Sequence, residues 1–147
     1  MKMRVSIAAA SAAALLGTGA FVLPAVASST AASHTLKFIS VTKKSIMFTK
    51  ASGAQQDTDV SKTGKTVGFD MLYFRATSAR SATLNITVDT TGGFLYGKGK
   101  VSFKTGAVTH GKVTGGTGAF KGATGTIKAR NLNKAGTRTA VTITYHT

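Results

Sequence analysis

Residues 113–125 read Val113-Thr114-Gly115-Gly116-Thr117-Gly118-Ala119-Phe120-Lys121-Gly122-Ala123-Thr124-Gly125. Five of the eleven residues from Gly115 to Gly125 are glycine. Glycine adopts positive φ at little cost and, lacking a Cβ, lets another strand or a ligand approach closely. Apolar, β-rich sequence flanks the run on both sides, so the run predicts a tight corner between two strands. The residues expected to form this corner are Gly115, Gly116, Gly118, Phe120 and Gly125.

Outward from this corner, apolar and polar residues alternate with a period of two, which is the signal of a β-strand. The alternation is cleanest in Ala82–Asp89. Thr90-Thr91-Gly92-Gly93 then predicts a hairpin turn, since its glycines supply the positive φ that such turns need. Other strands are predicted at Leu36–Thr42 and Ser45–Thr49 (two strands or one bent strand), Thr66–Ala76, Phe94–Phe103, Ala107–Thr114, Gly125–Arg130 and Thr137–Tyr145.

Ala51–Gly64 is polar and contains glycine, so we expect a long loop there. No segment after residue 27 has a convincing helical period. Seven or eight short strands joined by glycine turns favour an all-β fold, a single closed antiparallel β-barrel, over an open sheet. A β-sandwich is the main competing fold.

The stretch from Lys65 to His146 resembles the dirigent and allene-oxide-cyclase barrel family. The residues that carry the resemblance fall in family order: Val67-Gly68, the turn at Thr90–Gly93, the GGTG-x-F corner, Ala123-Thr124-Gly125, Arg130 and Thr142–His146. The resemblance implies a barrel of about eight strands whose apolar interior shapes a small ligand. Members of known activity steer phenoxy-radical coupling without redox chemistry of their own, or cyclise an unstable fatty-acid epoxide. Known relatives are often trimers.

This sequence departs from the family's pattern where chemistry is concerned. Leu36–Thr49 holds no acidic residue, Phe69-Asp70-Met71-Leu72 replaces a polar stretch, and the chain has no glutamate. The family's fold is therefore expected here, whereas a specific activity is not carried over.

Asp70 is the candidate catalytic residue. It lies mid-strand among apolar residues, where a carboxylate is unfavourable unless it is hydrogen-bonded or protonated. If it faces the interior, burial raises its pKa and makes it a plausible proton donor or ligand anchor. The simpler alternative is a carboxylate at a strand edge, paired with Arg75, Arg80 or a lysine. The residues expected to line a ligand site beside it are Met71, Tyr73 and Phe74.

No metal or cofactor is expected. His34, His110 and His146 are not at metal-ligand spacing, and the chain has no cysteine. Asp89, beside the predicted hairpin, is interpreted as a turn residue.

The first 27 residues have the pattern of a secretory signal peptide. Lys2 and Arg4 precede an apolar run, and Ala25-Val26-Ala27 predicts cleavage before Ser28. A transmembrane anchor is the alternative, but the apolar run is short. We expect a secreted protein with a flexible tail over residues 28–34 and one barrel domain over residues 35–147. The alanine-rich composition suggests a bacterial source.

The charge balance is strongly basic, with 19 Lys and Arg against four Asp. Without Lys2 and Arg4, 17 basic residues remain against the four Asp, a net charge of +13. Such a surface attracts polyanions, among which a secreted protein meets anionic cell-envelope polymers. Lys98 and Lys100 share one strand face, as do Lys128 and Arg130, but aromatic stacking partners are sparse, so no specific nucleic-acid partner is expected.

Three functions remain open from the sequence. The first is binding of a small apolar or phenolic molecule inside the barrel, without redox chemistry. The second is a cyclase or isomerase with Asp70 as its acid. The third is a structural or adhesive protein that binds the cell envelope through its positive charge. Because known relatives are often trimers, the resemblance also implies a homotrimer, and Thr66–Arg75, apolar on both faces, fits an outer face that meets a neighbour. A monomer with an apolar surface is the alternative.

Overall fold

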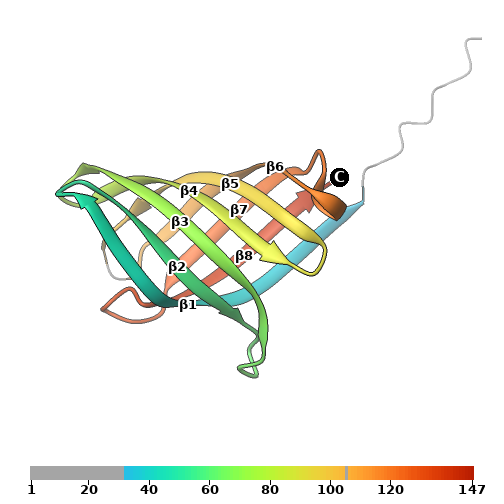
Figure 1. The fold of residues 1–147 in the computed structure, drawn as a ribbon, viewed down its shortest axis with the longest axis horizontal. Coiled ribbons are helices and arrows are strands. Elements are labelled where there is room, and N and C mark those ends of the chain that lie inside the picture. The colour runs from blue at the N-terminus through green and yellow to red at the C-terminus, as the bar shows by residue number, and fades with distance from the viewer. Residues whose placement is uncertain (1–31, 105) are drawn as a thin grey trace, which may run out of the picture.

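The structure, a computed structural model, describes residues 32–104 and 106–147 of the 147-residue chain. The predicted signal peptide and most of the predicted tail lie outside the described residues. Eight antiparallel strands follow one another around a closed barrel (Figure 1). Their bounds are β1 Ser33–Thr49, β2 Ser52–Val60, β3 Thr66–Ser78, β4 Ser81–Thr90, β5 Gly93–Ser102, β6 Val108–Gly116, β7 Thr124–Asn131 and β8 Arg138–His146.

The first and last strands close the barrel. β1 pairs antiparallel with β8 over nine residues of each strand, from Ser33 opposite His146 to Val41 opposite Arg138. Every strand therefore has two hydrogen-bonded neighbours. Beyond Thr42, however, β1 pairs only with β2, so this end of β1 is an edge of the sheet. The predicted closed antiparallel barrel is confirmed, and the competing β-sandwich is wrong.

The two segments expected at Leu36–Thr42 and Ser45–Thr49 form one bent strand. An irregularity in the pairing with β2, between Thr42 and Lys44, marks the bend. The strand starts at Ser33, within the predicted tail, because Ser33 and His34 pair with the end of β8.

The expectation of a long loop over Ala51–Gly64 is wrong, because β2 occupies Ser52–Val60. This strand pairs on one side with β1 and on the other with β3. Its inward positions include Asp57 and Asp59 instead of apolar residues. The strand therefore carries no hydrophobic alternation, although its burial alternates as in any barrel strand.

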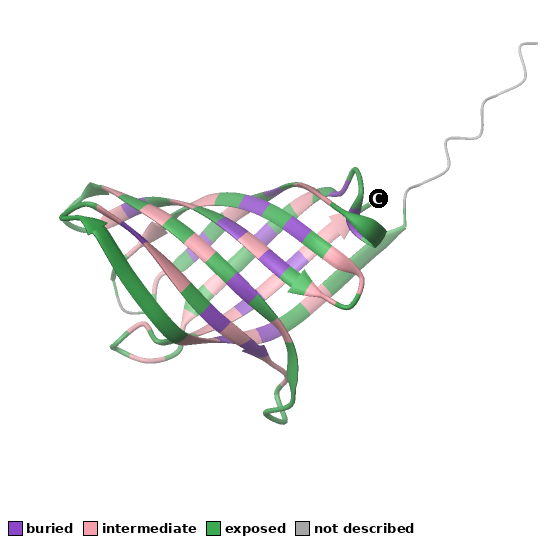
Figure 2. Ribbon diagram, viewed as in Figure 1, coloured by how far each residue is buried: buried purple, intermediate pink, exposed green. Residues whose placement is uncertain are grey.

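Alternation of buried and exposed residues along the strands separates the interior from the outer wall (Figure 2). The apolar core gathers at the end of the barrel where the predicted corner lies. There Val88, Leu95 and Ile143 are completely buried, and they form one cluster with Phe120, Val113, Ala123 and Ile127 among others. This cluster fills one end of the barrel.

The glycine corner is a three-residue 3₁₀ helix, η1 (Gly118–Phe120), between β6 and β7. Two backbone hydrogen bonds join this corner to the β4–β5 hairpin: Ala119 N donates to Gly92 O at 2.9 Å, and Thr117 N donates to Phe94 O at 2.8 Å. Phe120 is buried and meets the ring of Tyr145 edge-on, with 5.3 Å between ring centroids. The corner thus closes the barrel end with an aromatic side chain. In the described part of the chain η1 is the only helix, and none has the length and hydropathy to cross a membrane.

The corner depends on Gly118 more than on its neighbour Gly122. Both have positive φ, 57° and 78°, but a Cβ on Gly118 would strike the carbonyl oxygen of Gly92, whereas one on Gly122 would meet nothing within 4 Å. Gly122→Ala should therefore cost only the left-handed backbone penalty of about 1–2 kcal/mol. Gly118→Ala should lower the free energy of unfolding by at least twice as much, measured by urea denaturation. Equal losses would contradict this account of the corner.

Candidate functional site

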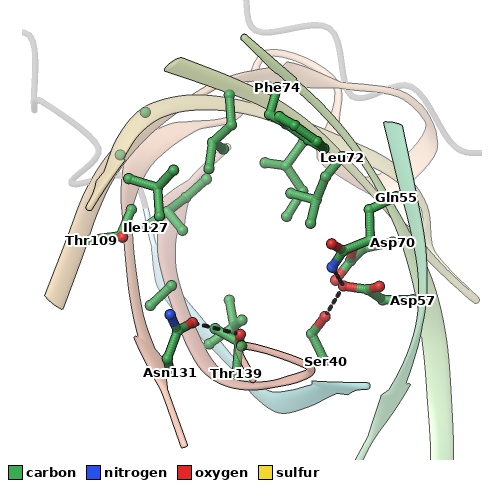
Figure 3. Close-up of a pocket in the computed structure, with 18 of the residues that line it drawn as sticks. Ser40, Gln55, Asp57, Asp70, Leu72, Phe74, Thr109, Ile127, Asn131 and Thr139 are labelled. Atoms are coloured by element: carbon green, nitrogen blue, oxygen red, sulfur yellow. Dashed lines mark hydrogen bonds between the residues drawn. The ribbon is translucent and has the colours of Figure 1, made fainter. Parts of the chain in front are cut away.

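A cavity of about 290 Å³ occupies the barrel interior between the apolar core and the end of the barrel opposite η1. It extends to Phe103, Ala135 and Gly136, which lie in the β5–β6 and β7–β8 connections. These connections lie at the end opposite η1, so the barrel is filled at one end and hollow towards the other. Much of its wall is apolar, formed by Leu72, Phe74, Ile86, Ile127 and Val141 among others (Figure 3).

Polar side chains from β1, β2 and β3 gather on one side of the cavity (Figure 3). Ser40 Oγ donates to Asp57 Oδ2 at 2.6 Å, and Gln55 Nε2 donates to the same oxygen at 2.8 Å. Gln55 Nε2 also donates to Thr42 Oγ1 at 2.9 Å. One oxygen of Asp57 is therefore well satisfied, while its Oδ1 is buried without a hydrogen-bond partner.

Asp57, Asp59 and Asp70 form what we call the carboxyl cluster. Asp57 lies directly opposite Asp70 in the β2–β3 register, and Asp59 follows two residues later on the same inward face. Asp57 is 2% exposed, and Asp59 and Asp70 are each 1% exposed. Asp57 and Asp70 border the cavity, whereas Asp59 lies outside its lining. When the carboxyls are ionised, both oxygens of Asp59 and both of Asp70 lack a hydrogen-bond donor.

The cluster holds protons at unusually high pH. Burial, followed by the charge of Asp70, a hydrogen bond with Asp70 and the charge of Asp57, raises the pKa of Asp59 to about 9. Burial, followed by the charge of Asp57, raises the pKa of Asp70 to about 6. At neutral pH Asp59 is therefore protonated and Asp70 is close to its titration point. Neighbouring carboxyl groups that cannot all ionise together are a recurring source of acid–base function.

Asp70 and Phe74, both predicted from the sequence, border the cavity. The prediction that Met71 and Tyr73 line it is wrong, because they are 61% and 45% exposed on the outer face of β3. Side chains alternate along a strand, so the inward position of Asp70 sends both of these neighbours outward. The homotrimer predicted from this outer face stays a prediction.

The expected pairing of Asp70 with a basic residue is not found. Its two oxygens have no hydrogen-bond partner, and Arg75 is exposed on the opposite face of β3. Asp89 is exposed on β4, one residue before the Thr90–Gly93 hairpin.

Sequence reasoning missed Ser40, Gln55, Asp57 and Asp59 as site residues. The two aspartates fell in the segment expected to be a loop. One signal was present, because Asp57 and Asp59 are two residues apart, the spacing that places both on one face of a strand.

The histidines lie away from the cavity, whereas Lys98 borders it from the outer wall. Within residues 32–104 and 106–147, no three His, Cys, Asp or Glu side chains have an arrangement that suits a metal ion. On the outer wall, Lys98 lies opposite Lys112, and His110 lies between Lys100 and Lys128 in the pairing of β5, β6 and β7. We call these five exposed residues the basic face; β6 thus joins the two lysine-bearing strands noted in the sequence.

The free energy of unfolding should fall as the pH rises from the pKa of an unfolded aspartate towards the raised pKa values of the folded carboxyl cluster. The folded carboxyls titrate above the unfolded value of 3.8, so the folded state binds more protons and loses this advantage at higher pH. Between pH 6.5 and 8.5, where Asp59 dominates, the free energy of unfolding should fall by about 1.4 kcal/mol per pH unit. Asp59→Asn should flatten this slope in urea denaturation, whereas the exposed control Asp89→Asn should retain it. An unchanged slope in Asp59→Asn would contradict the raised pKa.

Comparison with known proteins gives a fold and no sequence family. No protein-family model and no curated protein matches the sequence. Among solved structures, the chain is similar to a pyocyanin demethylase (17% identity, TM-score 0.59, covering 76% of this chain and 99% of the other). It is also similar to the pterocarpan synthase dirigent protein PsPTS1 (14% identity, TM-score 0.63, covering 78% of this chain and 95% of the other). A third similar structure is the exo-specific intermolecular Diels-Alderase AbnU (11% identity, TM-score 0.60, covering 79% of this chain and 99% of the other). The resemblance noted in the sequence is thus confirmed at the level of fold: the chain has the dirigent-like barrel.

Proposed function

We propose that this protein binds a small, largely apolar molecule in the barrel cavity. The observation that carries the proposal is the combination of an apolar wall with buried, unpartnered carboxyl oxygens in one cavity. Ligand sites are typically concave and mostly apolar, with a few polar groups that fix the orientation of the ligand. The volume of about 290 Å³ is at the small end of such sites.

The geometry suits a phenolic or otherwise amphiphilic molecule. Its apolar part would pack against Leu72, Phe74 and Ile127, and a hydroxyl would donate to Asp70 or Asp57. Such binding needs no redox group. Solved structures with this barrel include a dirigent protein and a Diels-Alderase, which supports a ligand inside the barrel without identifying it.

A second candidate is a cyclase or isomerase in which Asp70 supplies the proton. The position of Asp70 on the cavity wall favours it, as does a pKa of about 6, which permits proton donation and recovery near neutral pH. The two functions differ in the fate of the ligand: a binding protein returns it unchanged, whereas an enzyme converts it.

A third candidate, suggested by the basic face, is adhesion of a secreted protein to anionic cell-envelope polymers. Lys98 and Lys112 are directly opposed like charges, an arrangement that is unfavourable unless anions neutralise it. Secretion itself is a proposal that rests on the pattern of residues 1–27.

Ligand binding in the cavity should be blocked by filling it. Ala129 borders the cavity and Lys128, the next residue of β7, is exposed on the outer wall. Neutral aromatic alcohols, titrated into protein labelled at its methyl groups, should shift the NMR signals of Leu72, Ile86 and Ile127. Ala129→Leu should weaken binding at least tenfold, and Lys128→Leu should leave it unchanged. Shifts confined to outer-wall methyls, or equal behaviour of the two variants, would contradict binding in the cavity.

Adhesion through the basic face should collapse with salt. Replacing Lys98 and Lys112 by glutamine should reduce binding to anionic polymer, and binding by the unmodified protein should fall steeply between 50 and 200 mM salt, because phosphate contacts release counterions. The measurement is co-sedimentation with isolated cell walls or polyphosphate beads. Binding that is indifferent to salt, or to the double substitution, would exclude this candidate.

A further inference from the structure

We propose that the carboxyl cluster is a subsite for a protonated amine, so that the ligand is a small organic cation with an apolar body. This inference rests on the proposed function and narrows it to one chemical class. It follows from the hydrogen-bonding inventory of the cavity, from the charge of its wall and from the space beside the cluster.

The hydrogen-bonding inventory shows a shortage of donors. When all three carboxyls are ionised, five buried oxygens of the cluster have no hydrogen-bond donor: Asp57 Oδ1, both oxygens of Asp59 and both of Asp70. A proton on Asp59 supplies one donor, shared with Asp70, so acceptors still outnumber donors. The side-chain donors beside them, Ser40 and Gln55, are both directed to Asp57 Oδ2. Buried polar atoms in folded proteins almost always have partners. A ligand that completes this site must therefore bring donors rather than acceptors.

An ammonium group fits this requirement better than a hydroxyl or a carboxylate. It carries three N–H donors and no acceptor, whereas a hydroxyl offers one donor and adds acceptor lone pairs. Asp57 and Asp70 are cross-strand partners on the cavity wall, so one ammonium can donate to both. Asp59, two residues from Asp57 on the same inward face but outside the cavity lining, adds a negative charge when it ionises.

The surroundings of the cluster favour positive charge in the ligand. Beside it β1 presents Ser40, β2 presents Asp57 and Asp59, β3 presents Asp70, and β4 places the buried Val88 opposite Asp70. Lys98 borders the cavity, but it is exposed and belongs to the basic face on the outer wall. An anionic ligand would meet the cluster without compensation, while a cation would relieve the repulsion among its carboxyls.

The rest of the cavity accommodates an apolar body. Leu72 and Phe74 continue the inward face of β3 away from Asp70, and Ile127 lies across the cavity (Figure 3). An aryl or alkyl group attached to the ammonium by a short chain would pack against these side chains. Its burial stabilises the complex by about 25 cal/mol for each Å² of apolar surface removed from water.

Cation binding should be coupled to proton release. A bound ammonium favours the ionised carboxyls, so protons leave the cluster as the amine enters. Affinity should therefore rise from pH 5 to pH 8, a range in which the amine itself stays protonated. A neutral ligand of the same shape would show no such rise.

The test is isothermal titration calorimetry of the full chain with matched probes. These are 2-phenylethylamine and 4-phenylbutylamine, each beside the alcohol and the carboxylate of equal chain length. At least one amine should bind tenfold or more tightly than its alcohol, and the carboxylates should not bind. Titration at pH 7 in two buffers of different ionisation enthalpy should show net proton release with the amine only.

Matched variants locate the binding. Asp70→Asn keeps the shape of the side chain and should reduce amine affinity at least tenfold, a larger factor than the loss of alcohol affinity, because the amide oxygen still accepts from a hydroxyl but no longer carries the charge that attracts an ammonium. Asp89→Asn, on the outer wall, should change neither, and Ala129→Leu should weaken both compounds. Retained NMR dispersion in each variant shows that the barrel is intact.

The outcomes separate this inference from the proposed function. If amine and alcohol bind equally and Ala129→Leu weakens both, the cavity binds ligands but the amine subsite is wrong. The inference is equally overturned if Asp70→Asn binds the amine as well as Asp89→Asn does. If neither compound binds, or Ala129→Leu has no effect, the proposed cavity function fails together with the inference.

Discussion

Pairing of β1 with β8 is the constraint on which the rest of the structure depends. Where the sheet is closed, each strand has one face towards the interior and one towards solvent. β2 is mostly polar, yet it lies between β1 and β3 in the closed sheet and must also place alternate residues inside. The buried carboxyls of Asp57 and Asp59 are a direct consequence of this closure.

The interior of the closed barrel has two parts, an apolar core and a cavity with polar groups on its wall. Near η1, Leu95, Ile143 and Phe120 pack into an apolar core that fills the barrel and supplies hydrophobic stabilisation. The carboxyl cluster borders this core, since Asp70 lies opposite Val88, and the cavity extends from Asp57 and Asp70 towards the other end of the barrel. Burial of charge-bearing groups in the cluster opposes folding. Groups that destabilise a fold in this way are concentrated at functional sites in proteins. The cluster is therefore better explained by binding or proton transfer than by a contribution to stability.

The sequence predicted those parts of the fold that local chemistry determines. The clean alternation of Ala82–Asp89, the glycines of the Thr90–Gly93 hairpin and the glycine-rich corner were each sufficient to place their elements. β2 was missed because its inward residues are polar, so the hydrophobic period that identifies a strand is absent. A strand over Ser52–Val60 is nevertheless favoured for two general reasons. A loop of that length is uncommon, and a barrel that is antiparallel throughout and closes on its first strand requires an even number of strands.

The candidate site was only half predictable for the same reason. Asp70 stood out because an acid among apolar residues on one strand is anomalous by itself. The partners that raise its pKa lie on a neighbouring strand, and only the β2–β3 register brings Asp57 opposite Asp70. Met71 and Tyr73 were placed incorrectly because β3 is apolar on both faces, so the pattern did not show which face is inside.

The most direct test of this account is a pH titration of the aspartate carboxyl carbons by ¹³C NMR. The chain has only four acidic side chains, all of them Asp, so each signal can be assigned by a single Asp→Asn substitution. The account predicts that the signal lost in Asp70→Asn titrates near pH 6 and the signal lost in Asp59→Asn near pH 9. If every signal completes its titration below pH 5, the carboxyls are solvated or paired, and the buried cluster on which the proposed function depends does not exist.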